Sequence, residues 1–288
     1  MYMSRMIRPI FAAVALTLAT SAYGADLYIP PVEAPPPPPP VVEQVSVGGW
    51  YLRGDVGYRW SKLRGTEYIT YGPPPGTSEF TSTDLDGAAT LGGGIGYQIN
   101  RYFRTDFTAD YLFDSDFRGT TAGYCAGVPC TSTDRTSYSA LLLMANAYVD
   151  LGTYHGITPY VGAGIGGAYV KWDDLNNTIG DDSWTHKGAK EWRFAWSLMA
   201  GASYCLTQNL QLDAGYRFTR IEGGRMFEEF GPDGASIGAG PGFDDGFNIH
   251  QARAGLRYSF GGANVNCAAP QIAYEPPYQP PAEPVIYK

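Results

Sequence analysis

The sequence predicts an all-β fold, an eight-stranded antiparallel transmembrane β-barrel between two proline-rich extensions. Eight segments between residues 48 and 260 alternate apolar and polar side chains with a period of two, as residues on opposite faces of a strand do. The chain holds 37 Gly and 22 Tyr, which suit tight turns and aromatic belts. Long and short connections alternate between the segments, which is typical of barrels that cross a membrane.

Residues 1–24 are expected to form an export signal. Two arginines precede an apolar stretch at residues 10–19, and Ala-Tyr-Gly before residue 25 fits a small-x-small cleavage site. About ten apolar residues are too few for a membrane-spanning helix, which needs roughly 18, and no other segment approaches that length. Cleavage would leave Ala25 and Asp26 at the start of the mature chain.

Proline-rich segments flank the predicted barrel. Residues 25–47 include an unbroken run of prolines at 35–40, and residues 261–288 have the same character. Because proline removes a backbone donor and fixes φ, both segments are expected to be extended polyproline II linkers rather than core. At about 3.1 Å per residue, residues 25–47 could stretch roughly 70 Å. The barrel domain is therefore predicted over residues 48–260.

The predicted strands are about ten residues or more, enough for a tilted strand to cross the hydrocarbon layer. They cover residues 49–61, 89–99, 103–113, 141–151, 159–172, 191–206, 210–218 and 253–260. A soluble sandwich shows the same alternation, but aromatic side chains here gather near the segment ends, as Trp50 and Trp60 do. An open sheet in lipid would leave backbone groups unpaired, so the sheet is expected to close.

The connections give the expected orientation. Long loops are predicted at residues 62–86, 116–136, 173–190 and 222–246, and short links at residues 100–101, 152–157 and 207–208. Long loops face outward and short turns face the periplasm in such barrels, so both termini are expected in the periplasm. Acidic pairs in the long loops, such as Asp244-Asp245, are expected to be solvated charge. The alternative is that they bind divalent ions that bridge lipopolysaccharide.

The polar face of the strands carries both arginines and aspartates, which predicts a charged lumen. The expected lumen residues are Arg53, Asp55, Arg59, Arg104, Asp106, Asp110, Arg193, Asp213, Arg217, Arg253 and Arg257. An eight-stranded barrel is just wide enough inside for its own side chains, and unpaired buried charges are costly. We therefore expect an ion-paired plug that packs the barrel. The alternative is a conducting or proton-relaying lumen.

Four cysteines in an exported chain can form disulfides. Cys125 and Cys130 are five positions apart in a loop-like stretch and are expected to close a small ring, which leaves Cys205 and Cys267 to each other. Predicted strands six and eight end on the same side, about two strand spacings or 10 Å apart, so a short tail could join this second pair. Two unrelated free thiols are the alternative for Cys205 and Cys267.

The two ends of the predicted barrel, GWYLRGDVGY and RAGLRYSF, resemble the opacity-type family of small outer-membrane β-barrels, which are abundant surface antigens in alphaproteobacteria. The resemblance covers residues 48–260 and implies an outer-membrane location. It also implies an assembly signal, read by the barrel assembly machinery, at Arg253, Gly255, Tyr258 and Phe260. In most relatives that phenylalanine ends the chain, whereas here 28 residues follow it.

The resemblance extends to barrels whose mature N-terminus, Ala-Asp or Ala-Glu, is joined to peptidoglycan by a periplasmic transpeptidase. Ala25-Asp26 matches that start, and the proline-rich arm behind it is long enough to reach the cell wall. The hypothesis makes the α-amine of Ala25 an attachment site that a separate enzyme modifies. An ordinary flexible leader is the alternative.

The three histidines are the candidate catalytic bases, because some outer-membrane barrels use a Ser/His/acid set to trim lipid A. His155 is expected in a short turn, His186 in an outer loop and His250 at the outer end of the last strand, without Ser and acid partners at convincing spacing. No metal-ligand spacing or cofactor motif occurs, since the glycine-rich stretches lie within strands with no helix after them. We predict that the chain is not an enzyme.

The sequence as a whole favours a structural envelope protein. It would hold the outer membrane, with lipid and lipopolysaccharide as neighbours, to peptidoglycan and display surface loops as adhesin or antigen. The host or surface ligand of those loops stays unidentified. A net charge of −8 argues against a nucleic-acid partner. The alternatives are a narrow porin-like channel and a lipid A-modifying enzyme.

Overall fold

A computed structural model describes residues 48–71, 75–125, 127–235 and 239–268. The predicted export signal, the N-terminal proline-rich segment with Ala25 and Asp26, and the tail from residue 269 onward lie outside the described residues. Every regular element in the described part is a strand. No helix there is long and apolar enough to cross a membrane.

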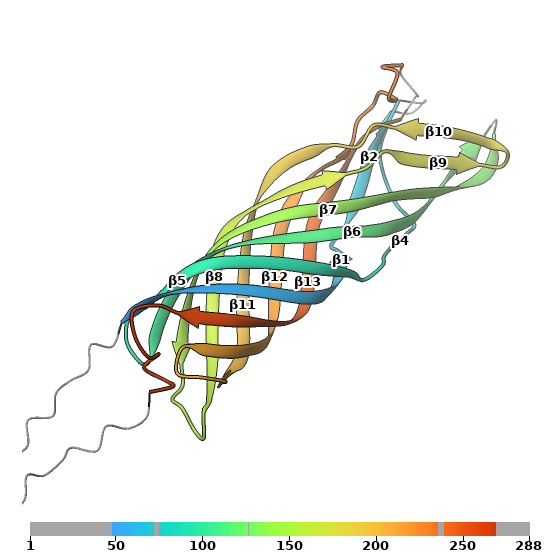
Figure 1. Cartoon of the computed structure of the whole chain (residues 1–288). Coiled ribbons are helices and arrows are strands. Elements are labelled where there is room, and N and C mark those ends of the chain that lie inside the picture. The colour runs from blue at the N-terminus through green and yellow to red at the C-terminus, as the bar shows by residue number, and fades with distance from the viewer. Residues whose placement is uncertain (1–47, 72–74, 126, 236–238, 269–288) are drawn as a thin grey trace, which may run out of the picture. The chain divides into compact units, whose positions relative to one another are not determined.

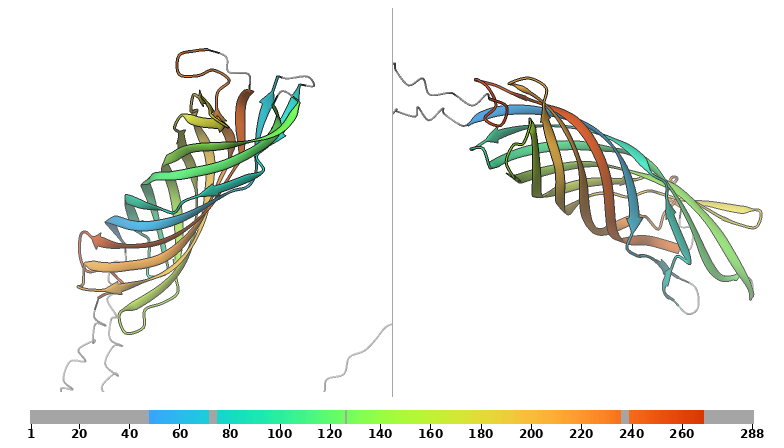
Figure 2. Two further views of the ribbon diagram at one scale, coloured as in Figure 1. Left: turned by 90° about the vertical axis from the view of Figure 1, so that its right-hand side faces the viewer. Right: turned by 90° about the horizontal axis from the view of Figure 1, so that it is seen from below.

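Eight long strands pair side by side in a closed antiparallel ring, which confirms the predicted number of strands (Figure 1). They are β1 Gly49–Leu63, β5 Ala88–Gln98, β6 Phe103–Cys125, β7 Val128–Asp150, β8 Ile157–Trp172, β11 Lys190–Cys205, β12 Leu210–Phe227 and β13 Ala239–Ser259. Pairing of β1 with β13 and of β6 with β7 closes the ring. Figure 2 shows the oblique strands surrounding one interior.

Five short strands add to the ring at the end of the long connections. They are β2 Thr66–Thr70, β3 Gly76–Glu79, β4 Ser82–Leu85, β9 Leu175–Ile179 and β10 Asp182–His186. β4 extends the sheet beside β6, and β9 with β10 extends it beside β7. Together with the long ends of β6 and β7 they project beyond the other strands (Figure 1).

The predicted loop at residues 116–136 is wrong, because those residues continue β6 and β7 into one hairpin of two 23-residue strands. β13 likewise begins at Ala239 rather than at residue 253. The alternation continues in the part of β13 before residue 253, but there the apolar residues lie on the inward face instead of the outward face. Leu256 and Tyr258 point outward, whereas Phe247 and Ile249 are buried inside the ring. A search for one continuous apolar face therefore cuts β13 short.

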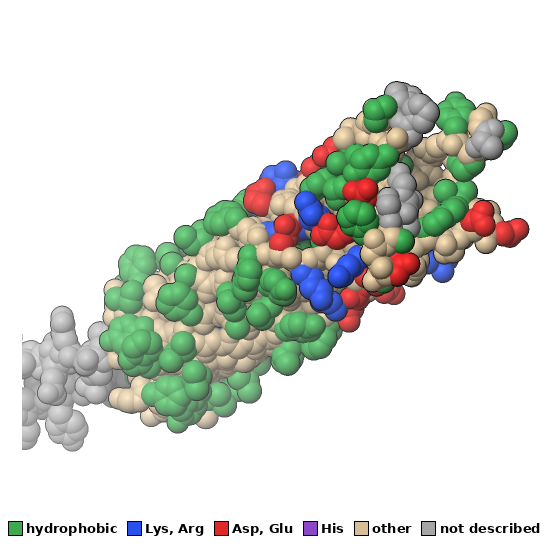
Figure 3. Space-filling model, turned by 90° about the horizontal axis from the view of Figure 1, so that it is seen from above, with side chains coloured by type: hydrophobic (Ala, Val, Ile, Leu, Met, Phe, Trp, Pro, Cys, Tyr) green, Lys and Arg blue, Asp and Glu red, His purple; other side chains and the backbone are tan. Residues whose placement is uncertain are grey.

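The outward surface is apolar near the short turns and charged nearer the long connections. On β1 the outward residues run from Trp50 through Leu52, Val56 and Tyr58 to Trp60, all exposed. On the face shown in Figure 3, hydrophobic side chains are spread over the half near the short turns, and charged side chains gather beyond them. Exposed aromatic and aliphatic side chains of this kind suit contact with lipid, flanked by aromatic girdles.

Candidate functional site

The interior of the ring is the candidate site, and its half near the short turns is lined by ion pairs. Arg53 donates from Nε and Nη2 to the two oxygens of Asp55, both at 2.8 Å, and from Nη1 to Asp106 Oδ2 at 3.0 Å. Asp106 also accepts hydrogen bonds from the Tyr51 hydroxyl at 3.1 Å and from Asn146 Nδ2 at 2.8 Å. Strands β1, β6 and β7 are thereby joined through one carboxylate.

Arg104 forms the second centre of this polar zone. Its Nε donates to Asp150 Oδ1 at 3.0 Å, and its guanidinium carbon lies 4.0 Å from the Tyr148 ring centroid and 4.6 Å from that of Tyr160. Both charged side chains are fully buried. Asp150 is missing from the predicted lumen set, although it lies in phase with Tyr148 on the same strand, and that phase could have identified it.

Asp110, Asp213, Arg217, Arg253 and Arg257 are buried in the same zone but are less evenly paired. Arg217 Nη1 donates to Asp110 Oδ2 at 2.7 Å, and a tyrosine hydroxyl donates to Asp213 Oδ1 at 2.7 Å. Arg253 and Arg257 have no salt bridge to a carboxylate within the described residues. Arg257 instead donates to neutral glutamine and serine oxygens. The polar zone is thus packed by charged side chains from five strands, β1, β6, β7, β12 and β13.

Two of the predicted lumen arginines lie nearer the long connections. Arg59 donates to the Tyr138 hydroxyl and to the Phe113 carbonyl, the latter at 2.7 Å. Arg193 Nη1 donates toward both oxygens of Asp244, at 2.6 and 2.8 Å. The prediction that Asp244 is a solvated loop charge is wrong, because it faces inward from β13 and is 3 % exposed.

Aromatic side chains close the half of the interior beyond these arginines. We call them the outer plug: Phe80, Phe117, Tyr138, Trp172, Phe227 and Phe247. The Tyr138 and Phe247 rings stack at 4.5 Å between centroids, and Phe117 meets Trp172 edge-on at 5.8 Å. Phe80, from the β3–β4 connection, packs on Phe117 at 5.7 Å. Sequence reasoning missed the plug because its residues lie where the alternation changes phase or in predicted loops.

Residues 261–268, the tail cap, fold against the ring end that carries the short turns. Asn264 is buried there, and its Nδ2 donates to Ser259 Oγ at 3.0 Å while its backbone N donates to the Gln208 carbonyl at 2.7 Å. Asn266 Nδ2 reaches Asp150 Oδ2 at 3.3 Å, so the tail cap contacts the polar zone directly. The stretch CAAPQIAYEPPYQPPAEPVIYK, which was predicted to be an extended proline-rich segment, lies mostly outside the described residues.

Both predicted disulfides are present. Cys125–Cys130, the tip disulfide, joins the ends of β6 and β7, so these residues lie in a hairpin rather than in a loop. Cys205–Cys267, the rim disulfide, joins the end of β11 to the tail cap across 62 positions. The rim disulfide therefore fixes the tail cap over the interior.

Comparison with known proteins places this architecture in a family. The family model described as "Outer membrane protein beta-barrel domain" matches residues 11–260. The chain belongs to the outer membrane β-barrel family. An uncharacterised Brucella abortus protein is 37 % identical over 277 residues, covering 85 % of this chain and 95 % of the relative. The barrel is also similar to the 31 kDa outer-membrane immunogenic protein of Brucella melitensis, 25 % identical over 253 residues, covering 87 % and 98 %.

Among solved structures, the barrel is similar to Neisserial surface protein A. The two are 18 % identical with a TM-score of 0.38, and the match covers 74 % of this chain and 97 % of the other. The family and the homologous outer-membrane proteins assign this chain to the outer membrane.

The histidines form no catalytic set among the described residues. His250 lies on the outward face of β13, where Nδ1 is 2.5 Å from the Tyr216 hydroxyl and the ring lies 5.3 Å from Phe218. His155 lies in the turn between β7 and β8. His186 was predicted in an outer loop; it belongs to the short strand β10 and is buried against Phe227. No cluster of three or more possible metal ligands occurs in the described part.

The residues assigned to the assembly signal occupy both faces of β13. Arg253 is buried in the interior, and Gly255 pairs with Asp55 of β1 and Asp213 of β12. Tyr258 and Phe260 are exposed on the outward face with ring centroids 5.1 Å apart, and the Phe260 backbone N donates to the Trp50 carbonyl at 2.9 Å.

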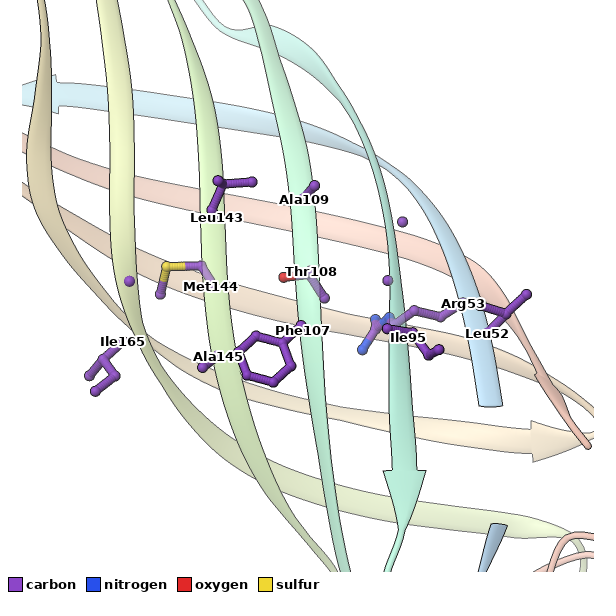
Figure 4. Close-up of a pocket in the computed structure, with 13 residues that line it drawn as sticks. Leu52, Arg53, Ile95, Phe107, Thr108, Ala109, Leu143, Met144, Ala145 and Ile165 are labelled. Atoms are coloured by element: carbon purple, nitrogen blue, oxygen red, sulfur yellow. The ribbon is translucent and has the colours of Figure 1, made fainter. Parts of the chain in front are cut away.

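One hollow of about 750 Å³ lies in the wall of the barrel across strands β1 and β5 to β8 (Figure 4). Glycine and alanine at its floor, including Gly93 and Ala109, stand among the larger Ile95, Phe107 and Leu143. Apart from Arg53 and Thr108 its lining is nonpolar.

Proposed function

We propose that this protein is a structural outer-membrane barrel that conducts no solute, joins the membrane to the cell wall and displays an ordered extension outside. The observation that carries the proposal is that the interior is filled at three levels. The outer plug, the ion-paired polar zone and the disulfide-held tail cap follow one another along it.

A conducting lumen is disfavoured by what an ion would have to displace. Passage would separate the stacked rings of the outer plug and break buried pairs such as Arg53–Asp106 and Arg104–Asp150. Such pairs resist separation, because a buried charge left without its partner is destabilising by about 3–5 kcal/mol. Because the interior of an eight-stranded barrel is just wide enough for its own side chains, we expect no spare channel beside these groups in the described part of the interior.

The orientation proposed here follows from the lengths of the connections. Only residues 99–102, 151–156 and 206–209 join strands at one end, whereas the other end carries the five short strands and the long hairpin. Short turns face the periplasm in barrels of this kind. With that orientation, Gly49 and the tail cap are periplasmic.

The tether would form at the mature N-terminus. A separate transpeptidase would join the α-amine of Ala25 to a carbonyl of a stem peptide and release the terminal residue of that peptide, so one amide bond replaces another. The intervening residues could reach roughly 70 Å as polyproline II. This sequence supports the proposal together with the resemblance to barrels attached in the same way.

Isolated sacculi test the tether. They are boiled in detergent, digested with muramidase and protease, and examined by mass spectrometry. A peptide that starts at Ala25 and carries a stem-peptide mass is expected. Replacing Ala25-Asp26 by Ser-Ser, with export checked from the mature mass, should remove that peptide. Recovery of only the free Ala25 peptide, all of it in the detergent extract, would refute the tether and leave the closed barrel unaffected.

Display of surface structure is the second part of the proposal. The β6–β7 hairpin holds Tyr124 and Val128 at its end, 79 % and 64 % exposed, beside the tip disulfide. A disulfide-closed hairpin presents such side chains with little loss of conformational entropy on binding. Proteolysis of intact cells should cleave at this hairpin only after reduction of the tip disulfide.

A further inference from the structure

A row of polar and cationic side chains lies directly above an aromatic row on the outward face of β1, β13 and β12. The aromatic row is Trp60, His250 and Phe218, in which Trp60 pairs with His250 and His250 pairs with Phe218. Two positions further along each strand, on the same face, lie Lys62, Asn248 and Arg220, again in direct register.

The depth of this row follows from the spacing of two tryptophans on β1. Trp50 and Trp60 both face outward, and each contacts a tyrosine ring, at 5.3 and 5.1 Å respectively. Ten residues at about 3.3 Å rise, tilted by about 45°, span roughly 23 Å along the membrane normal, close to the apolar band of about 25 Å in outer-membrane barrels. Lys62, Asn248 and Arg220 therefore lie at the level of lipid headgroups.

The patch formed by Lys62, Asn248, Arg220 and their neighbours Arg64, Glu222 and Asp245 holds more cations than carboxylates. Arg220 Nε is 3.4 Å from Glu222 Oε1, and Arg64 Nη1 is 3.3 Å from Glu222 Oε2, so one carboxylate serves two arginines. Lys62 has no salt bridge within the described residues and is exposed. A second carboxylate, that of Asp245, lies beside Gly65 at the far edge of the patch.

We propose that Lys62, Arg220 and Asn248 bind a phosphate group on the headgroup of an outer-leaflet glycolipid. Arginine offers a planar fork and lysine a mobile ammonium for phosphate oxygens, and the amide of Asn248 adds a neutral donor between them. The apolar face of Trp60, His250 and Phe218 below would contact the acyl chains of the same molecule. That contact favours a lipid phosphate over a soluble anion, because free phosphate has no acyl chain that could contact the aromatic row.

The test uses the folded full-length protein in detergent and native mass spectrometry with diphosphorylated lipid A as the probe. Lys62→Gln/Arg220→Gln removes both charges and keeps side chains of similar polarity. Arg135→Gln/Lys187→Gln removes two exposed charges, one from β7 and one from the β10–β11 connection, and is the matched control. Each basic residue near an anionic surface contributes about 1 kcal/mol, so the first double variant should bind lipid A about 30-fold more weakly, while the control keeps wild-type affinity.

Two further arms complete the test. Dephosphorylated lipid A should bind the wild type as weakly as diphosphorylated lipid A binds Lys62→Gln/Arg220→Gln, and inorganic phosphate at millimolar concentration should not displace the lipid. Equal lipid binding by the wild type and this variant, with heat-modifiable gel migration showing both folded, would overturn the site. Full displacement by inorganic phosphate would overturn the lipid assignment. None of these outcomes depends on the proposed tether.

Discussion

Replacing Asp244 by alanine should destabilise the barrel strongly, because it removes the acceptor of a buried guanidinium. Both oxygens of Asp244 accept from Arg193 Nη1, and the Trp172 indole Nε1 donates to Oδ2 at 3.2 Å. The Gly246 backbone N donates to Oδ1 at 2.9 Å. One carboxylate thus joins side chains from β8, β11 and β13 at the base of the outer plug.

The expected loss can be worked from these contacts. Removing one partner of a buried ion pair typically costs 3–5 kcal/mol, since the other charge stays buried without compensation. Arg193 would keep Glu191 Oε1 at 3.0 Å and the Arg225 carbonyl at 2.7 Å, which places the loss at the lower end. We expect the free energy of unfolding to fall by about 3 kcal/mol.

The assay is guanidinium unfolding of the protein in lipid vesicles, followed by tryptophan fluorescence. Asp245→Ala is the matched control, because Asp245 is exposed and should change the free energy by no more than about 0.5 kcal/mol. Arg193→Leu/Asp244→Leu, which removes both charges, should recover much of the loss. Equal effects of Asp244→Ala and Asp245→Ala would refute the assignment of Asp244 to a buried pair.

Three other predictions follow from the same structure. Phe117→Ala should cost about 3–5 kcal/mol by opening a cavity in the outer plug, whereas Phe107→Ala, on the lipid face, should cost less than half of that in the same unfolding assay. Loss of the rim disulfide through serine substitutions should cost about 4 kcal/mol and loss of the tip disulfide about 2 kcal/mol, because the entropy of the unfolded chain scales with the loop that each bond closes; the reverse order would contradict this. Burial lowers the pKa of His186, so the unfolded chain binds a proton more readily. Its contribution to stability is full above about pH 6.5 and falls as the pH drops below that value, and unfolding midpoints at pH 7.5 and 5.5 should therefore differ less in His186→Gln than in the wild type.

The half of the barrel near the short turns could be predicted from the sequence because one rule holds there. Apolar side chains meet lipid and polar side chains face inward, so Arg53, Asp106 and Arg257 could be assigned to the interior from alternation alone. The close spacing of Cys125 and Cys130, and the shared side of Cys205 and Cys267, sufficed for the disulfides.

The outer half could not be predicted in the same way. Above the aromatic girdle the surroundings are aqueous, and the interior rather than the exterior becomes apolar. Phe247 and Ile249 therefore occupy the face that Arg253 occupies lower on β13. Asp244 and Asp245 look alike in sequence, yet their burial differs because adjacent residues of a strand face opposite sides. The partners that bury Asp244 lie on strands distant in sequence.

Single-channel recording of the purified, folded protein in planar bilayers tests the closed interior most directly. The account predicts a baseline current at both polarities, because the outer plug, the polar zone and the tail cap fill the lumen. Reproducible unitary steps that require folded protein and disappear after heat denaturation would contradict it. The outer plug would then have to open in the membrane, and the barrel would have to be regarded as a channel.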